Sequence, residues 1–125
     1  MLSAAQALLG RVDAIYVTSD NTVISAFAAV AGLADANHLP LFAGDTSSVA
    51  DGAIAALGFD YYQVGHAAGL KAAMILKGEK TAGEIPSGYA ENPNLHLNLV
   101  AAARQGLAID QRFIAMARSG GKVIE

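Results

Sequence analysis

The stretch "VTSDNTV" at residues 17–23 places a run of small polar residues between two apolar segments. The segment before it, residues 14–17, is short and partly β-branched, which favours a strand. The segment after it, residues 22–36, repeats apolar residues at helical spacing and is stopped by Pro40. A second short apolar run follows at residues 41–43. A strand, a helix and a strand in this order, with a crossover of this length, predict a parallel α/β sheet.

Helices and strands continue to alternate along the rest of the chain. We expect a helix at residues 2–9 ended by Gly10, a short helical turn at 49–51, a third strand at 53–57, a helix at 62–77 ended by Gly78, a loop at 81–94, a strand at 95–99 and two short terminal helices. The alanines of residues 53–57 would also suit a helix. The expected fold class is α/β, a three-layer lobe built on a parallel sheet.

Composition and charge exclude several classes of protein. The chain has 125 residues, of which 54% are hydrophobic and 15% charged, which suits a single globular domain. The net charge of -3 and the scattered Lys and Arg leave no basic stripe, so we expect no nucleic-acid partner. The absence of cysteine excludes disulfides and thiolate chemistry. The N-terminal residues lack a basic region ahead of their apolar part, and no apolar run reaches the length of a membrane span, so these residues predict neither an export signal nor a transmembrane segment.

Polar breaks follow each of the first three expected strands. In an open α/β sheet, ligands bind outside the carboxyl ends of the strands, where loops converge. Ser19 or Asp20 can cap the helix that follows the first break. The remaining side chains, with the free N–H groups of Asn21 and Thr22, can hold a ligand carboxylate or hydroxyl. The first break is therefore both a helix start and a candidate ligand site.

The second and third breaks leave two interpretations open. Asp45, between Gly44 and three hydroxyl residues, either caps the next helical turn or pairs with the ammonium or hydroxyl groups of a ligand. Phe59, Tyr61 and Tyr62 at the third break either stack on a ligand or belong to the core and its rim.

No arrangement of residues predicts catalysis. His38, His66 and His96 have no metal-ligand spacing, and no nucleophile motif or phosphate-binding glycine pattern occurs. Asp20 and Asp45 at neighbouring strand ends serve binding as well as acid–base chemistry. These residues therefore predict no catalytic site, no metal and no cofactor.

The chain resembles a known family over almost its whole length. The strings "VDAIYVTSDNTVISA" at 12–26, "LPLFAGDTSSVADGAIAALGFDYYQVGHAAGLKAAMILKGEK" at 39–80 and "NPNLHLNLVAAARQGLAI" at 92–109 resemble the later portion of substrate-binding proteins of ABC importers, in the branch linked to aromatic amino acids. The resemblance implies a type I periplasmic-binding-protein-like fold, in which two α/β lobes close around a small solute and deliver it to a membrane permease. It also implies a solute receptor and not an enzyme, a periplasmic or other extracytoplasmic location, and an amino acid as the ligand.

The resemblance assigns roles to particular residues. Ser19, Asp20 and Asn21 would face the cleft, and Asp45 would be the acidic ligand contact. Phe59 and Asp60 would lie where the chain crosses between lobes, and Thr18 and Thr46 are weaker candidates for the same wall. The expected site is Thr18, Ser19, Asp20, Asn21, Asp45, Thr46, Phe59 and Asp60.

The sequence departs from the family in length. The resemblance makes residues 1–60 a second-lobe unit, residues 61–94 a crossover helix and loop of the other lobe, and residues 95–125 the terminal strand and helices, with the first lobe largely missing. The apolar helix at 62–77 would then lose its cover, which predicts a homodimer through that exposed face. Loss of the opposite cleft wall predicts weak ligand binding.

Two other functions stay open at this point. The same fold serves as the effector-sensing domain of transcription regulators, although no basic helix-turn-helix occurs in these residues. A flavodoxin-like enzyme would use Asp20 or Asp45 as a phosphoryl acceptor or metal ligand.

Overall fold

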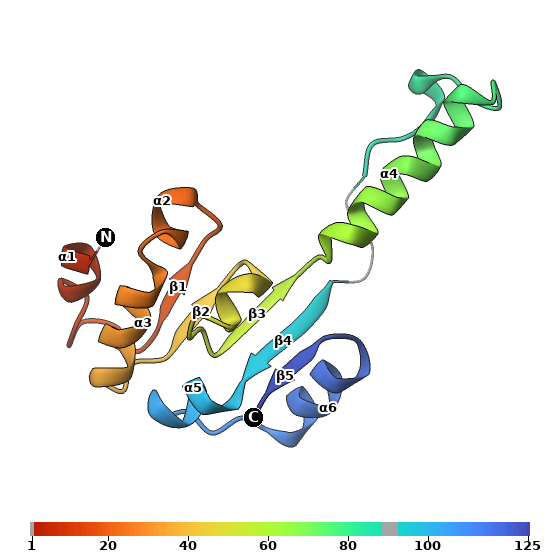
Figure 1. Ribbon diagram of the computed structural model, residues 1–125. Helices are drawn as coiled ribbons and strands as arrows, with labels where there is room; N and C mark the ends of the chain where they lie inside the picture. Colours follow the sequence, from red (N-terminus) through yellow and green to blue (C-terminus); the bar gives the residue numbers. More distant parts are fainter. Residues whose placement is uncertain (1, 89–92) are drawn as a thin grey trace. The chain divides into compact units, whose positions relative to one another are not determined.

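The computed structural model describes residues 2–88 and 93–125. The chain divides into two compact units (Figure 1). Residues 1–58 and 94–125 form the first, called here the sheet unit. Residues 59–93 form the second, called the α4 unit after its long helix.

Five strands form the sheet unit's single sheet. They are β1 (Ile15–Val17), β2 (Leu41–Ala43), β3 (Ala55–Gly58), β4 (Asn94–Asn98) and β5 (Lys122–Ile124), and they lie side by side in this order. β1, β2 and β3 are parallel, β4 is antiparallel to β3, and β5 is parallel to β4. The predicted α/β class with a mostly parallel sheet is confirmed. β4 is antiparallel, which corrects the wholly parallel sheet, and β5 lies where the sequence predicted a terminal helix.

Helices occupy both units. The sheet unit contains α1 (Leu2–Gln6), α2 (Asn21–Ile24), α3 (Phe27–Ala36), the 3₁₀ turn η1 (Thr46–Val49), α5 (Leu99–Arg104) and α6 (Gln111–Gly120); the α4 unit contains α4 (Tyr61–Leu76) and the 3₁₀ turn η2 (Ala82–Glu84). The single helix predicted at 22–36 is wrong, because the chain breaks between α2 and α3. At the break the Ser25 hydroxyl donates a hydrogen bond to the Thr22 carbonyl, 2.9 Å away, and such local bonds compete with helix geometry.

Other boundaries differ from expectation by a few residues. The first helix ends at Gln6 instead of residue 9, and a turn leads to Gly10, whose φ of +70° suits glycine. The third strand begins at Ala55 instead of residue 53, because the chain first turns at Gly52, with φ +114°. The predicted loop at 81–94 contains η2, and its residues 89–92 lie outside the described part of the chain.

Each face of the sheet carries its own core. Because side chains alternate along a strand, Ile15, Val17, Leu41 and Ala43 point to one face, where they pack with the helices α1 and α3. On the other face Leu97 packs with Ile114 and Ala117 of α6. The sheet therefore lies between two helical layers. On this second face α6 packs against β4 and β5. At the other side of the same face, Tyr16 of β1 is 65% exposed.

A buried amide joins four segments of the sheet unit. Gln105, just after α5, has no exposed surface. Its side-chain Oε1 accepts from the Leu41 N–H at 2.8 Å, and its Nε2 donates to the Gly52 carbonyl at 2.9 Å and to Asp35 Oδ1 at 2.8 Å. These bonds link α5 to β2, to the turn before β3 and to α3. In the described part of the chain, no buried side-chain nitrogen or oxygen lacks a partner.

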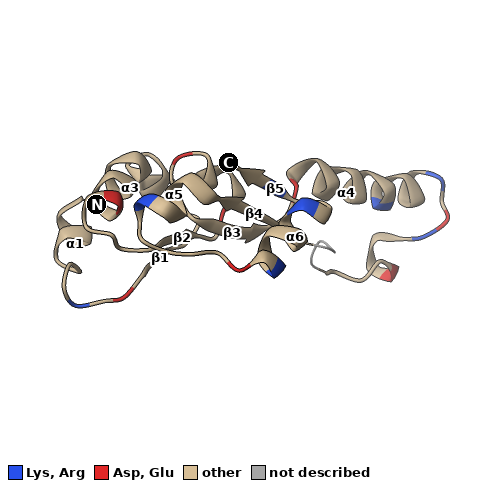
Figure 2. Cartoon of the chain, turned by 90° about the horizontal axis from the view of Figure 1, so that it is seen from below, with Lys and Arg blue, Asp and Glu red and all other residues tan. Residues whose placement is uncertain are grey.

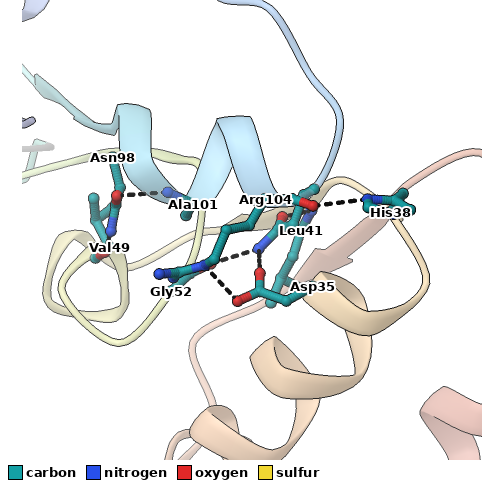
Figure 3. Close-up of polar contacts among 9 residues, drawn as sticks. Asp35, His38, Leu41, Val49, Gly52, Asn98, Ala101 and Arg104 are labelled. Carbon is teal, nitrogen blue, oxygen red and sulfur yellow. Dashed lines mark hydrogen bonds and ion pairs between the residues drawn. The ribbon is translucent and has the colours of Figure 1, made fainter.

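Further polar contacts surround the amide (Figure 3). Arg104 Nε lies 2.7 Å from Asp35 Oδ2, and His38 Nδ1 donates to the Arg104 carbonyl at 2.9 Å. Asn98 accepts from the Ala101 N–H at 2.8 Å and so caps α5, while its Nδ2 donates to the Val49 carbonyl at 2.9 Å. This cap ends β4 at Asn98, one residue before the predicted end at 99.

Charged residues are few and spread singly along the chain, with Lys and Arg interleaved with Asp and Glu (Figure 2). Among the residues that the structure describes, no helix combines the length and the hydropathy needed to cross a bilayer.

Replacement of Gln105 by Leu tests the buried network. The substitution leaves the Leu41 N–H and the Gly52 carbonyl without partners, so we expect a loss of about 2–4 kcal/mol in the free energy of unfolding. Urea unfolding measures it, with Gln6→Leu as the matched control, because Gln6 is exposed and should change stability by less than about 0.5 kcal/mol. Equal stabilities of the two variants would contradict the role assigned to Gln105.

Candidate functional site

The carboxyl ends of β1 and β2 lie next to each other. The two strands pair in parallel register, with Val17 opposite Ala43, and the Gly44 N–H donates to the Val17 carbonyl at 2.9 Å. The segments that follow the two strands, residues 18–21 and 44–46, therefore leave the sheet at the same edge. The structure thus brings six of the predicted site residues to one edge: Thr18, Ser19, Asp20, Asn21, Asp45 and Thr46.

Asp20 caps the helix after β1. Its Oδ1 accepts from the Thr22 N–H at 2.8 Å and from the Val23 N–H at 3.2 Å. Asp20, and not Ser19, is therefore the N-cap. The prediction that the Thr22 N–H is free for a ligand is wrong, because the cap uses it. The second oxygen of Asp20, and the side chains of Ser19 and Asn21, have no hydrogen bond to any described residue.

Asp45 is the N-cap of the turn after β2, as Asp20 is the N-cap of the helix after β1. Its Oδ1 accepts from the Ser47 N–H at 3.0 Å, and its Oδ2 accepts from the Ser47 hydroxyl at 2.7 Å and from the Ser48 hydroxyl at 3.4 Å. The first of the two interpretations of Asp45, the cap, is confirmed. The three donors also fix the direction of the carboxylate at the edge of the sheet.

Two glycines allow close packing at the strand ends. A Cβ on Gly44 would lie 2.8 Å from the Tyr16 hydroxyl oxygen and 3.7 Å from the Ser19 backbone nitrogen. A Cβ on Gly58 would lie 3.0 Å from Thr46 Cγ2. The ends of β1, β2 and β3 are therefore joined by direct contacts. Tyr16 was not predicted as a site residue, although the alternation of side chains along β1 places it on the opposite face from Ile15 and Val17.

Phe59 and Asp60 belong to the α4 unit. Asp60 caps α4, because its Oδ1 accepts from the Tyr62 N–H at 2.7 Å. Phe59 is 38% exposed, and Tyr61 and Tyr62 are more exposed still. They belong to a different unit from the six residues at the sheet edge.

Two carboxyl groups outside the predicted site have shifted pKa values. The backbone N–H of Thr81, and then its hydroxyl, lower the pKa of Glu84 through hydrogen bonds. The side chain of Arg112, and then its backbone N–H, lower the pKa of Asp110. Both sets of bonds are part of capping: Asp110 is the N-cap of α6, and Glu84, the last residue of η2, bonds back to the N-cap Thr81.

Two cavities border the sheet unit. One, of about 310 Å³, follows β1 and is lined by Ala4, Ala5, Leu8, Ile15, Tyr16, Val17, Thr18, Val23 and Val30. The other, of about 220 Å³, is lined by Thr46, Ser47, Val49, Ala50, His96, Lys122 and Ile124. Thr18 lines the first cavity and Thr46 lines the second, so each cavity includes one threonine of the predicted site. Within residues 2–88 and 93–125, no three His, Asp or Glu side chains are grouped to hold a metal ion.

The chain matches a described protein family over almost its whole length. The model of the ABC transporter substrate binding protein family matches residues 1–120. The chain belongs to this family. Over 110 residues it is 34% identical to a "Tyrosine-binding protein" of Clostridioides difficile, a match that covers 86% of this chain and 32% of that protein.

Solved structures agree with this assignment. A conserved domain protein from Vibrio cholerae has a TM-score of 0.79 and 38% identity, and the match covers 98% of this chain and 40% of that one. An ABC domain from Streptococcus pneumoniae in complex with L-Trp has a TM-score of 0.79 and 26% identity, again over 98% and 40% of the two chains. The chain thus spans about a third to two fifths of the length of these relatives.

Asp20→Ala tests the cap at the first strand end. Removal of the acceptor of two N–H groups should lower the free energy of unfolding by about 1 kcal/mol, and Asp20→Asn, which keeps an acceptor oxygen, should lower it by clearly less. Urea unfolding followed by circular dichroism measures both. An alanine variant as stable as the original chain would show that the cap contributes nothing.

Proposed function

We propose that the sheet unit supplies one wall of an amino-acid-binding site in an ABC importer's substrate-binding protein. Membership of the family supports the binding role. The tyrosine named for one relative and the L-Trp bound to another support an aromatic amino acid as the ligand.

The arrangement of the two strand ends carries this proposal. Asp20 and Asp45 lie in the segments that follow two adjacent parallel strands, and the hydrogen bond from the Gly44 N–H to the Val17 carbonyl joins the starts of these segments. An amino acid needs an anionic partner for its ammonium group and hydrogen-bond donors for its carboxylate. Carboxylates, hydroxyls and backbone N–H groups all occur at this edge.

Asp45 is the proposed partner of the ligand's ammonium group. Its carboxylate is held by the N–H and hydroxyl groups of Ser47 and by the Ser48 hydroxyl, so little ordering is left to be done when a ligand binds. Thr18, Ser19, Asn21 and Thr46 are proposed to contribute the polar rim, and Asp20 the second carboxylate.

The remaining assignments follow from the family and stay proposals for this chain. Phe59 and Asp60 would lie at the crossing between lobes, and residues 61–94 would belong to the other lobe. The bound solute would be passed to an ABC permease. Proteins of this family are generally extracytoplasmic, which supports the same location here. The family is one of substrate-binding proteins, which favours solute binding over a regulatory or enzymatic role.

Asp45→Asn tests the proposed site. The original chain should show a higher melting temperature with millimolar L-tyrosine, L-tryptophan or L-phenylalanine, and Asp45→Asn should bind about tenfold or more weakly, because a charge-assisted bond is lost. Asp51→Asn is the control, since Asp51 is exposed and its side chain bonds to no described residue. The absence of any shift in the original chain would contradict the proposed function.

The homodimer predicted from the sequence remains a prediction. It rests on α4, an apolar helix with no buried residue, in which Leu70, Met74 and Leu76 are exposed. Light scattering after size-exclusion chromatography should give twice the chain's 12.7 kDa, and Leu70→Glu should shift the mass toward one copy. A monomeric original chain would refute the dimer.

A further inference from the structure

Tyr16 places a phenol at the strand-end site. The ring comes from β1, is 65% exposed, and lies on the face of the sheet opposite to α1 and α3. Its hydroxyl lies 2.8 Å from the point where Gly44 would carry a Cβ, and the Ser19 nitrogen lies 3.7 Å from that same point. The hydroxyl therefore lies beside Gly44, the residue that follows β2. It is at the edge of the sheet that also carries Asp20 and Asp45.

Two donors at this edge remain without acceptors in the described part of the chain. Neither the Tyr16 hydroxyl nor the Ser19 backbone N–H forms a hydrogen bond there. Both lie beside Gly44, within reach of the same small volume. A carboxylate, which offers two oxygens and accepts only, satisfies two neighbouring donors of this kind.

Gly44 makes this position possible. Any side chain at residue 44 would overlap the phenol oxygen, so glycine lets the ring rest on the backbone next to the strand ends. Tyrosine has only two χ angles, and a ring supported on one side loses little freedom when a ligand binds. The phenol is thus already positioned in the absence of ligand.

We propose that Tyr16 contacts the ligand, with its hydroxyl and the Ser19 N–H donating to the carboxylate of a bound amino acid while Asp45 receives the ammonium group. This inference rests on the proposed function. It assigns opposite ends of the zwitterion to different strand ends, the carboxylate to β1 and the ammonium to β2.

Binding of L-tryptophan and tryptamine tests the assignment. The chain contains no tryptophan, so indole fluorescence anisotropy reports the bound ligand alone. Tyr16→Phe should weaken L-tryptophan binding about tenfold or more, the usual effect of losing a bond to a charged group, and should leave tryptamine binding unchanged because tryptamine has no carboxylate. Ser3→Ala, which removes an exposed hydroxyl on α1, is the control and should change neither.

Gly44→Ala provides a second, independent variant. Its Cβ displaces the phenol oxygen, so it should weaken L-tryptophan binding as much as Tyr16→Phe, with little further loss when the two are combined. Gly32→Ala is the control, because a Cβ there meets nothing within 4 Å.

The outcomes distinguish the role of Tyr16 from the proposed function on which that role rests. Unchanged L-tryptophan binding in Tyr16→Phe overturns the role of Tyr16 and leaves the proposed function standing. Equal weakening of L-tryptophan and tryptamine overturns the carboxylate assignment. If the original chain binds neither ligand, the proposed function itself fails, and the inference fails with it.

Discussion

The parallel pairing of β1, β2 and β3 is the constraint on which the site depends. Parallel strands in register end at the same edge, so the loops after β1 and β2 must leave the sheet side by side. Each of these loops contains an aspartate whose carboxylate accepts hydrogen bonds from N–H groups of the turn that follows. The polar residues after β1 therefore both start a helix and line an edge of the sheet. Glycines at residues 44 and 58 let neighbouring loops and strands approach closely enough to form one continuous surface.

A buried polar network holds the elements behind this edge. Gln105 ties α5 to β2, α3 and the turn before β3, and Asn98 ties the start of α5 to the end of η1. Because these amides are buried and their bonds leave no side-chain atom unpaired among the described residues, a shift of one element would break several bonds together. The network thus keeps β2, whose carboxyl end carries Asp45, fixed with respect to the surrounding helices. A binding edge that is already ordered needs little rearrangement when a solute arrives.

The sequence predicted the α/β class, the first two strands and the positions of the polar strand ends, because apolar periodicity and aspartate caps are local signals. It did not predict the break at Ser25 and Ala26, where a hydroxyl bonds to the backbone within an otherwise apolar helical pattern. It also missed β5 and the antiparallel direction of β4, since the direction of a strand depends on tertiary pairing. The proximity of Tyr16 to Gly44 was missed because it joins positions 28 residues apart through the sheet, which no local pattern records. The capping roles of Asp20 and Asp45 were within reach of local reasoning.

The most direct test of the central claim is a map of ligand contacts on the folded chain. Titration of ¹⁵N-labelled protein with L-tyrosine, followed by amide NMR shifts, reports every backbone position at once. The account predicts that the largest changes gather at Ser19, Gly44 and Thr46, the residues where the ends of β1 and β2 meet. Changes confined to the surroundings of His96 and Lys122, with none at those three residues, would place binding elsewhere and contradict the account.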